Sequence, residues 1–276
     1  MLAQEQSGEF EFHDSDFKFI AQFVNERTGI VLTEQKRALV YGRLSRRLRT
    51  LGMNTFAEYC ASLQEDGDGA EVKHLINAIT TNLTEFFREP HHFDFLESEL
   101  SPLKNAAGPI RLRIWSAGCS SGEEPYSIAM TVRKVLGSSP KCDVKILATD
   151  IDSDILATAK AGNYSSDKLS SIPRELASRF TRQSSSSLVM SDELKSMIVF
   201  NELNLFDKWP FKRPFDIIFC RNVAIYFSIE SKKRLFDRFA DNLKPNGLMI
   251  IGHSENLARN SDRFTHVART VYRKRG

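Results

Sequence analysis

Polar residues directly follow two apolar runs of this sequence. Asp150 follows the run at residues 144–148, and Arg221 and Asn222 follow the run at residues 215–220. Both runs predict buried strands, and the carboxyl ends of parallel strands meet at the edge of a sheet where open α/β folds bind ligands. A carboxylate there accepts hydrogen bonds from ribose hydroxyls, and such charge-assisted bonds are about twice as strong as neutral ones.

A glycine-containing turn follows the first predicted strand, at residues 110–115. Gly118 and Gly122 let a ligand approach the backbone closely. Their spacing does not match GxGxxG, and no Gly-Lys-Ser/Thr run follows, so neither a dinucleotide fingerprint nor a phosphate-binding P-loop is present. For Asp150 an alternative stays open, because together with Asp152 it is equally suited to capping the next helix.

The run TTNLTEFFRE, residues 80–89, predicts the start of a helix. Asn82 is suited to the N-cap and Glu85 to the third helical position, as in a capping box. Capping does not account for Arg88. In a helix it shares a turn with Thr84, and the pair would present a guanidinium and a hydroxyl to a ligand carboxylate.

Two further groups extend this candidate site. Asn204 and Leu205 follow another predicted strand, where the amide would recognise the edge of a purine and the leucine would pack on its face. Tyr226 and Phe227 follow the polar end of the strand at residues 215–220. Taken alone, both aromatic residues are better explained as core.

The composition is that of an ordinary globular protein. The chain has 276 residues, of which 41% are hydrophobic and 26% charged, and a formal net charge of +3. A disordered or membrane-spanning chain is excluded, and the charge is too small to indicate nucleic acid as the default partner. No CxxC pair and no apolar leader are present, so we expect a cytoplasmic protein without a metal site or disulfides.

The periodicity of apolar residues changes once along the chain. Residues 14 to about 100 show only helical spacing, whereas strands and helices alternate after a linker at residues 101–109. We therefore expect an all-helical domain over residues 1–98 and an α/β domain over residues 99–276, with a doubly wound, mostly parallel sheet. The alternation fails at about residues 165–200, where we expect an inserted, small antiparallel β-subdomain. Other expected elements are strands at residues 197–202, 248–252 and 270–273 and helices at residues 153–161 and 229–243.

Five runs together resemble the chemotaxis receptor methyltransferase family, CheR, over nearly the whole chain. They are TTNLTEFFRE, WSAGCSSGEEPYSIAM, ATDID, FCRNVAIYF and GHSEN, in the order of the family. The resemblance implies an all-helical N-terminal domain joined to a class I, Rossmann-like S-adenosylmethionine-dependent methyltransferase domain. It implies methyl transfer to glutamate side chains in the cytoplasmic helices of chemoreceptors, giving glutamyl methyl esters and S-adenosylhomocysteine, with neither nucleic acid nor membrane insertion involved.

Matching these runs to the family also implies roles for single residues. Asp150 would bind the ribose, Thr84 and Arg88 would lie near the amino-acid end of the cofactor, and Glu123 would pair with its α-ammonium. The implied cofactor contacts are Asn82, Thr84, Arg88, Glu123, Asp150, Asn204, Leu205, Arg221 and Asn222. A glutamate substrate is already ionised, with a reference pKa of about 4.3, so the reaction depends on positioning more than on a base. We expect Tyr226 and Arg88 to orient the substrate carboxylate.

Two other functions are less consistent with these residues. A cofactor-sensing adaptor without catalysis is disfavoured, because the polar residues of the reacting face, Asn222 and Tyr226 among them, are all present. A nucleic-acid methyltransferase would need a basic groove and a pocket for a flipped base. The sequence has no NPPY-like run.

Two features bear on how a receptor would be recognised. Arg43, Arg46 and Arg47 share one face of a basic helix, and we favour receptor docking over the usual explanation, a solvated basic face. Family members that bind a pentapeptide at the receptor C-terminus resemble one another in a longer, glycine-containing loop of the β-subdomain, whereas residues 179–190 contain no glycine. We therefore expect a pentapeptide-independent enzyme, the alternative being that another edge strand still pairs with a receptor tail.

Overall fold

The chain forms two compact units, each with its own hydrophobic core. The computed structural model describes residues 9–257 and 261–276. The units are Met1–Thr81 and Asn82–Gly276.

The division lies after Thr81, and not near residue 98 as the periodicity predicted. The reason is α5 (His91–Leu100), whose Phe93, Leu96 and Leu100 are buried in the core of the second unit. Because α5 is itself helical, its apolar spacing could not show which of the two cores it joins.

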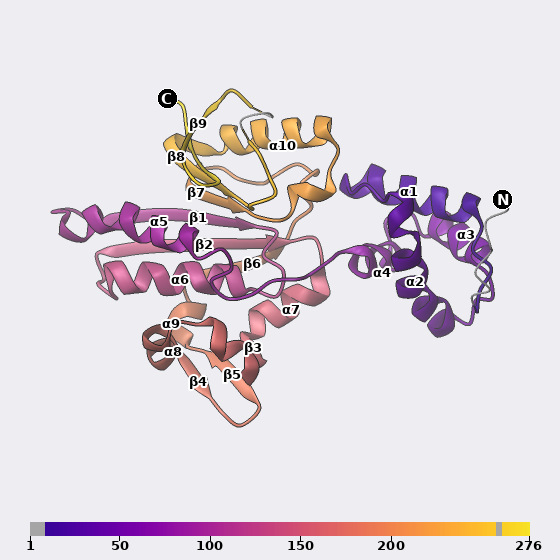
Figure 1. The fold of residues 1–276 in the computed structure, drawn as a ribbon, viewed down its shortest axis with the longest axis horizontal. Coiled ribbons are helices and arrows are strands. Elements are labelled where there is room, and N and C mark those ends of the chain that lie inside the picture. Colours follow the sequence, from indigo (N-terminus) through magenta and orange to yellow (C-terminus); the bar gives the residue numbers. More distant parts are fainter. Residues whose placement is uncertain (1–8, 258–260) are drawn as a thin grey trace. The chain divides into compact units, whose positions relative to one another are not determined.

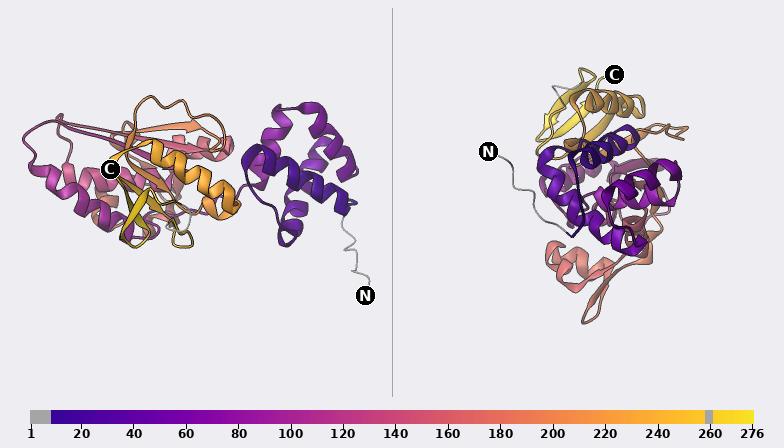
Figure 2. Two further views of the ribbon diagram at one scale, coloured as in Figure 1. Left: turned by 90° about the horizontal axis from the view of Figure 1, so that it is seen from above. Right: turned by 90° about the vertical axis from the view of Figure 1, so that its right-hand side faces the viewer.

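The first unit is a group of helices with its own apolar core (Figures 1 and 2). They are α1 (Asp14–Thr28), the 3₁₀ turn η1 (Glu34–Lys36), α2 (Arg37–Leu51), α3 (Phe56–Asp66) and α4 (Ala70–Ile79). α1 ends at Gly29 and α2 at Gly52, with φ of 70° and 67°, a left-handed conformation that costs glycine little. Thr55 caps α3 by accepting from the backbone N–H of Glu58.

The second unit is built on a seven-stranded sheet with the order β6-β2-β1-β7-β8-β10-β9 (Figure 1). Its strands are β1 (Ile110–Ala117), β2 (Cys142–Asp150), β6 (Ile198–Glu202), β7 (Phe215–Cys220), β8 (Leu243–Ile251), β9 (Phe264–Ala268) and β10 (Val271–Lys274). β6, β2, β1, β7 and β8 pair in parallel, and β10 and β9 add antiparallel at one side. The strand order reverses between β1 and β7, which is where open α/β sheets bind ligands.

Helices pack on both faces of this sheet, as a doubly wound fold requires. They are α6 (Glu123–Leu136), α7 (Ser153–Ala161) and α10 (Ile229–Asp241). Successive side chains of β1 point to opposite faces. Ile114 joins the core that contains Ile128 of α6, whereas Trp115 packs on Phe239 of α10 with ring centroids 5.2 Å apart. The predicted fold class is confirmed.

A small antiparallel sheet of order β3-β5-β4 interrupts the alternation. Its elements are β3 (Asn163–Ser165), the 3₁₀ segment η3 (Ser166–Ser171), α8 (Arg174–Phe180), β4 (Thr181–Gln183), β5 (Ser187–Met190) and α9 (Asp192–Lys195). The serine run forms the β4–β5 turn, in which the Ser184 N–H donates to the Ser187 carbonyl. We call this insertion the β-subdomain.

Two local expectations were wrong. Residues 82–90 form no helix. α10 ends at Asp241, and Pro245 lies inside β8, at a place where the pairing of β8 with β7 is irregular and a proline is tolerated. The edge strand β9 was not foreseen. Among the described residues, no helix is long and apolar enough to cross a membrane.

Candidate active site

The turn after β1 is shaped by residues in left-handed conformation. Gly118, Ser120 and Gly122 have φ of 88°, 50° and 96°. A Cβ at Gly118 would stand 2.3 Å from Cγ2 of Val223, so only glycine lets this turn lie against the one after β7. The backbone of this turn thereby lies close to the turn after β7, at the switch point of the sheet.

Asp150 is held at the end of β2 by backbone donors. Its Oδ2 accepts from the Ser120 N–H at 2.7 Å and its Oδ1 from the Asp152 N–H at 3.1 Å. Burial raises the pKa of Asp150, and these hydrogen bonds oppose the rise. The cap of α7 is Asp152, which accepts from the N–H groups of Asp154 and Ile155. The two aspartates thus have different roles, and the Asp150 carboxylate keeps acceptor capacity for a ligand.

Glu123 is a buried carboxylate at the start of α6. Its side chain is only 2% exposed. Oε2 accepts from the Ser121 hydroxyl at 2.5 Å, and Oε1 lies 3.1 Å from Nζ of Lys168. No pattern in the sequence pointed to Lys168, which lies in η3 of the β-subdomain.

The segment 82–90 is an extended, irregular strap rather than the helix we expected. Phe87 and Glu89 have φ of 53° and 57°, which breaks any helical path. Asn82 does not cap a helix; its amide donates to Oδ2 of Asp152 at 2.7 Å. Nη1 of Arg88 donates to the Leu83 carbonyl at 2.8 Å. Thr84 and Arg88 therefore share no helical turn.

Arg221 is committed to contacts inside the protein. Its side chain is 3% exposed, with Nη1 3.0 Å from Oε2 of Glu124 and Nη2 3.2 Å from Oε2 of Glu89. Nη2 also donates to the Arg88 carbonyl. The guanidinium thus connects residues 88–89 of the strap with Glu124 at the start of α6. Because both terminal nitrogens of its side chain have partners within the protein, the contact of Arg221 with a cofactor stays a prediction.

Glu89 is the centre of a polar cluster beside this arginine. Oε1 is 2.6 Å from Nδ1 of His253, and Oε2 is 3.4 Å from Nδ1 of the buried His92. Burial alone would raise the pKa of Glu89, but the His253 hydrogen bond and the charge of Arg221 outweigh it and lower the pKa to about 2. Glu89, His91 and His92 are close enough to bind a metal ion, yet the Arg221 cation already shares the Glu89 carboxylate.

Glu255, in the GHSEN run, holds the turn after β7. Its Oε2 accepts from the N–H groups of Gly252 at 2.7 Å and Asn222 at 3.2 Å. Asn222 has a φ of 59°, and a Cβ at Gly252 would stand 2.6 Å from its Nδ2. In the sequence this run marks only the family resemblance, and no spacing or residue pattern predicts the role of Glu255.

The remaining expected residues follow the ends of two strands: Asn204 and Leu205 follow β6, and Tyr226 follows β7. Asn204 forms a local turn in which its Oδ1 accepts from the Phe206 N–H at 3.0 Å. Leu205 is buried and its carbonyl accepts from Arg238 at 2.6 Å. Tyr226 ends the 3₁₀ turn η4 (Ala224–Tyr226) and is half-buried.

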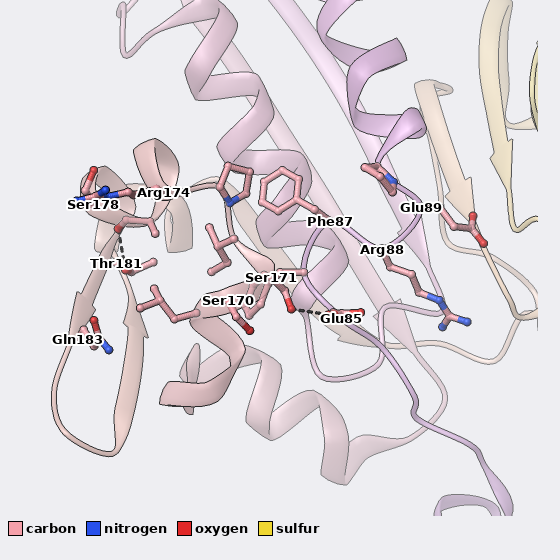
Figure 3. A pocket seen from close by; sticks show the side chains of 16 residues that line it. Glu85, Phe87, Arg88, Glu89, Ser170, Ser171, Arg174, Ser178, Thr181 and Gln183 are labelled. Atoms are coloured by element: carbon pink, nitrogen blue, oxygen red, sulfur yellow. Dashed lines mark hydrogen bonds between the residues drawn. The ribbon is translucent and has the colours of Figure 1, made fainter.

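An open groove of about 1030 Å³ separates the strap from the β-subdomain (Figure 3). One wall is residues 85–90 and the other includes η3, α8 and β4. The Ser171 hydroxyl donates to Oε1 of Glu85 across it, and the Arg88 side chain points away from β4.

In the helical unit, the three arginines of α2 are not equivalent. Nη1 of Arg43 donates to the carbonyls of Ala78, Ile79 and Thr80 at the end of α4. Arg47 forms an ion pair with Glu71 at 2.6 Å, and its side chain is 25% exposed. Arg46 is the exposed member of the three. Arg43 and Arg47 therefore already have partners within the protein, and Arg46 is the best placed of the three to meet a receptor.

Comparison with known proteins places the chain in a family. The model "CheR methyltransferase, all-alpha domain" matches residues 15–80, and "CheR methyltransferase, SAM binding domain" matches residues 82–273. The fold and the matched domain define an S-adenosylmethionine-dependent methyltransferase of class I. The chain belongs to the CheR methyltransferase family, which confirms both the resemblance and the predicted class of enzyme.

Individual relatives are similar over most of their length. The chain is 42% identical to the "Probable chemotaxis protein methyltransferase" of Rhizobium etli, over 89% of this chain and 94% of that protein. It is also 42% identical to the "Chemotaxis protein methyltransferase" of Escherichia coli, over 94% of this chain and 90% of that one. A solved structure, PKMT2 from Rickettsia typhi in complex with AdoHcy, is 15% identical with a TM-score of 0.37, covering 62% of this chain and 26% of that chain. That similarity is too low to carry an argument.

Proposed function

We propose that this enzyme methylates glutamate side chains in the cytoplasmic helices of chemoreceptors, giving glutamyl methyl esters and S-adenosylhomocysteine. S-adenosylmethionine supplies the methyl group. The observation that carries the proposal is the pair of buried carboxylates, Glu123 and Asp150, held on either side of the Gly118–Gly122 turn at the switch point. Relatives at 42% identity named as chemotaxis methyltransferases support the substrate class.

The donor set fits the chemical groups of this cofactor. Asp150 would accept from the ribose hydroxyls, as its remaining acceptor capacity allows. Glu123 would bind the α-ammonium, and Thr84 and Arg88 the α-carboxylate. The proposed adenine contacts are Asn204 and Leu205, with Asn82, Arg221 and Asn222 completing the site.

Arg88 and Tyr226 are the proposed orienting groups for the substrate carboxylate. A glutamate ionised at neutral pH needs no base, so the residues serve by holding one oxygen in line for transfer. Nη1 of Arg88 is anchored to Leu83, which leaves its other nitrogens to face a ligand. Tyr226 is half-buried beside the Asn222 turn that Glu255 fixes.

The direct test is incubation with radiolabelled S-adenosylmethionine and receptor-containing membranes. We expect labelled receptor, and because a methyl ester hydrolyses in mild base, release of the label as methanol. Cofactor binding without any transfer would instead favour a sensing adaptor. Base-stable label would move the acceptor away from carboxylates.

We further propose a cytoplasmic enzyme that needs no receptor C-terminal pentapeptide. The β4–β5 turn is short and glycine-free, closed by the bond between Ser184 and Ser187. Titration of the full-length protein with receptor C-terminal peptides tests this. Full activity on tail-less receptors and no peptide binding are expected, whereas micromolar binding that depends on residues 179–190 would contradict the proposal.

A further inference from the structure

One lysine of the β-subdomain reaches into the proposed cofactor site. Nζ of Lys168, in η3, lies 3.1 Å from Oε1 of Glu123 and donates to the Thr84 carbonyl at 3.1 Å. Glu123 and Thr84 are both proposed above to bind the amino-acid end of the cofactor. The Lys168 ammonium thus links the β-subdomain to that end of the site, beside the bond that the Tyr164 hydroxyl of β3 donates to the Ser121 carbonyl at 2.8 Å.

Glu123 needs a cation at this place. Its side chain is 2% exposed, and a buried carboxylate without a positive partner is strongly disfavoured. The Ser121 hydroxyl on Oε2 is a neutral donor and supplies no charge. Lys168 supplies the charge on Oε1.

The ε-ammonium of lysine and the α-ammonium of an amino acid are the same chemical group, with three N–H donors and one positive charge. Two such groups beside one buried carboxylate would compete for the same oxygen and repel each other in a poorly solvated site. The Lys168 side chain is 33% exposed, so it has solvent to move into.

We propose that Lys168 is a built-in counter-ion of Glu123 that the α-ammonium of the cofactor displaces. This inference rests on the proposed function, and specifically on Glu123 as the ammonium site. Its consequence is a link between cofactor binding and the β-subdomain, because η3 loses one of its two bonds to the strap and keeps the one between Ser171 and Glu85 (Figure 3). Leu169, Ser170 and Ser171 of η3 line the groove, so its wall would loosen when the site is filled.

The first test is calorimetric, on the full chain carrying Lys168→Met. S-adenosylhomocysteine has the α-ammonium, whereas methylthioadenosine lacks the amino-acid end. We expect about two- to fivefold tighter binding of S-adenosylhomocysteine, the range for release of a partly exposed competing ion pair, and unchanged binding of methylthioadenosine. Lys160→Met, at an exposed lysine of α7, removes the same charge elsewhere and should change neither affinity.

Weaker or unchanged S-adenosylhomocysteine binding in Lys168→Met would overturn the inference while leaving the proposed function intact. Equal tightening for both ligands would overturn it as well, since the effect would not depend on the ammonium. If the wild-type protein bound neither ligand, the proposed function would fall too.

The second test follows backbone hydrogen exchange at residues 166–171. In the wild type, S-adenosylhomocysteine should raise exchange there and methylthioadenosine should not. In Lys168→Met, exchange should be high from the start and insensitive to either ligand. Protection of these amides by S-adenosylhomocysteine would show that Lys168 stays in place, which contradicts displacement.

Discussion

Ionised side chains are held differently at the carboxyl edge of the sheet and on α2 of the helical unit. At the sheet edge, Arg221 is 3% exposed and binds two carboxylates and a carbonyl. On α2, Arg47 is 25% exposed and binds one carboxylate, and Arg46 is exposed. Removing a partner from a buried group leaves an unpaired charge, whereas water replaces a partner lost at the surface. We therefore expect stability at the sheet edge to depend on each buried ion pair, and any receptor binding by α2 to depend on its total exposed charge.

The largest expected effect is on folding, at Arg221. Arg221→Met leaves Glu124 and Glu89 without their shared cation and should lower the free energy of unfolding by about 3–5 kcal/mol, measured by urea titration. Adding Glu124→Gln should recover part of this loss. The control is Arg113→Met, whose pair with Asp143 is 36% and 45% exposed and should contribute less than about 1 kcal/mol. Equal losses for the two arginines would show that burial does not set the cost of losing an ion-pair partner.

The next effect is on cofactor affinity, at Asp150. Asp150→Asn should weaken S-adenosylhomocysteine binding by about 1.5–3 kcal/mol, because a neutral amide replaces the charged acceptor of the ribose hydroxyls. Asp152→Ala is the comparison variant: it removes the cap of α7 and the contact with Asn82, and it should cost about 1 kcal/mol of stability with a smaller change in affinity. Unchanged binding by a folded Asp150→Asn protein would restrict Asp150 to holding the turn.

A third prediction concerns the pH dependence of stability through Glu89. Its pKa is lowered from 4.5 to about 2 in the folded protein, so the unfolded chain binds more protons between these values. The contribution of Glu89 is fully present above pH 4.5 and is lost as the pH falls towards 2. Unfolding titrations should show the gap between wild type and Glu89→Gln narrowing as the pH drops below 4.5. A gap that stays constant would mean that Glu89 is not stabilised as a carboxylate.

The smallest effect is expected on α2. Arg46→Glu should raise the apparent KM for receptor a few-fold and leave cofactor binding unchanged, and the effect should shrink with salt because exposed charges are screened over about 8 Å at physiological ionic strength. Arg47→Glu is a poorer probe, since it also breaks the pair with Glu71. Unchanged receptor kinetics for Arg46→Glu would make this an ordinary solvated face.

Local patterns predicted most of the architecture. Strand β7 has the predicted limits, residues 215–220, and helix α7 spans the predicted residues 153–161. Both follow from short-range causes: an apolar run of strand length, and a helix between an aspartate cap and Gly162 in left-handed conformation. The location of Asp150 and Asn222 at one edge of the sheet was also predictable, because the carboxyl ends of parallel strands meet at the same edge.

The sequence by itself determined the fold class and the motifs that mark the family, because both depend on residue type and spacing along the chain. Only the tertiary structure decided which core α5 joins, that Asp152 rather than Asp150 caps α7, and that Arg221 binds inward. It alone also brought Lys168 to Glu123, residues far apart in sequence. The physical reason is that a buried charge takes whichever partner the folded chain brings within hydrogen-bonding distance, and no spacing rule encodes a contact between separate elements.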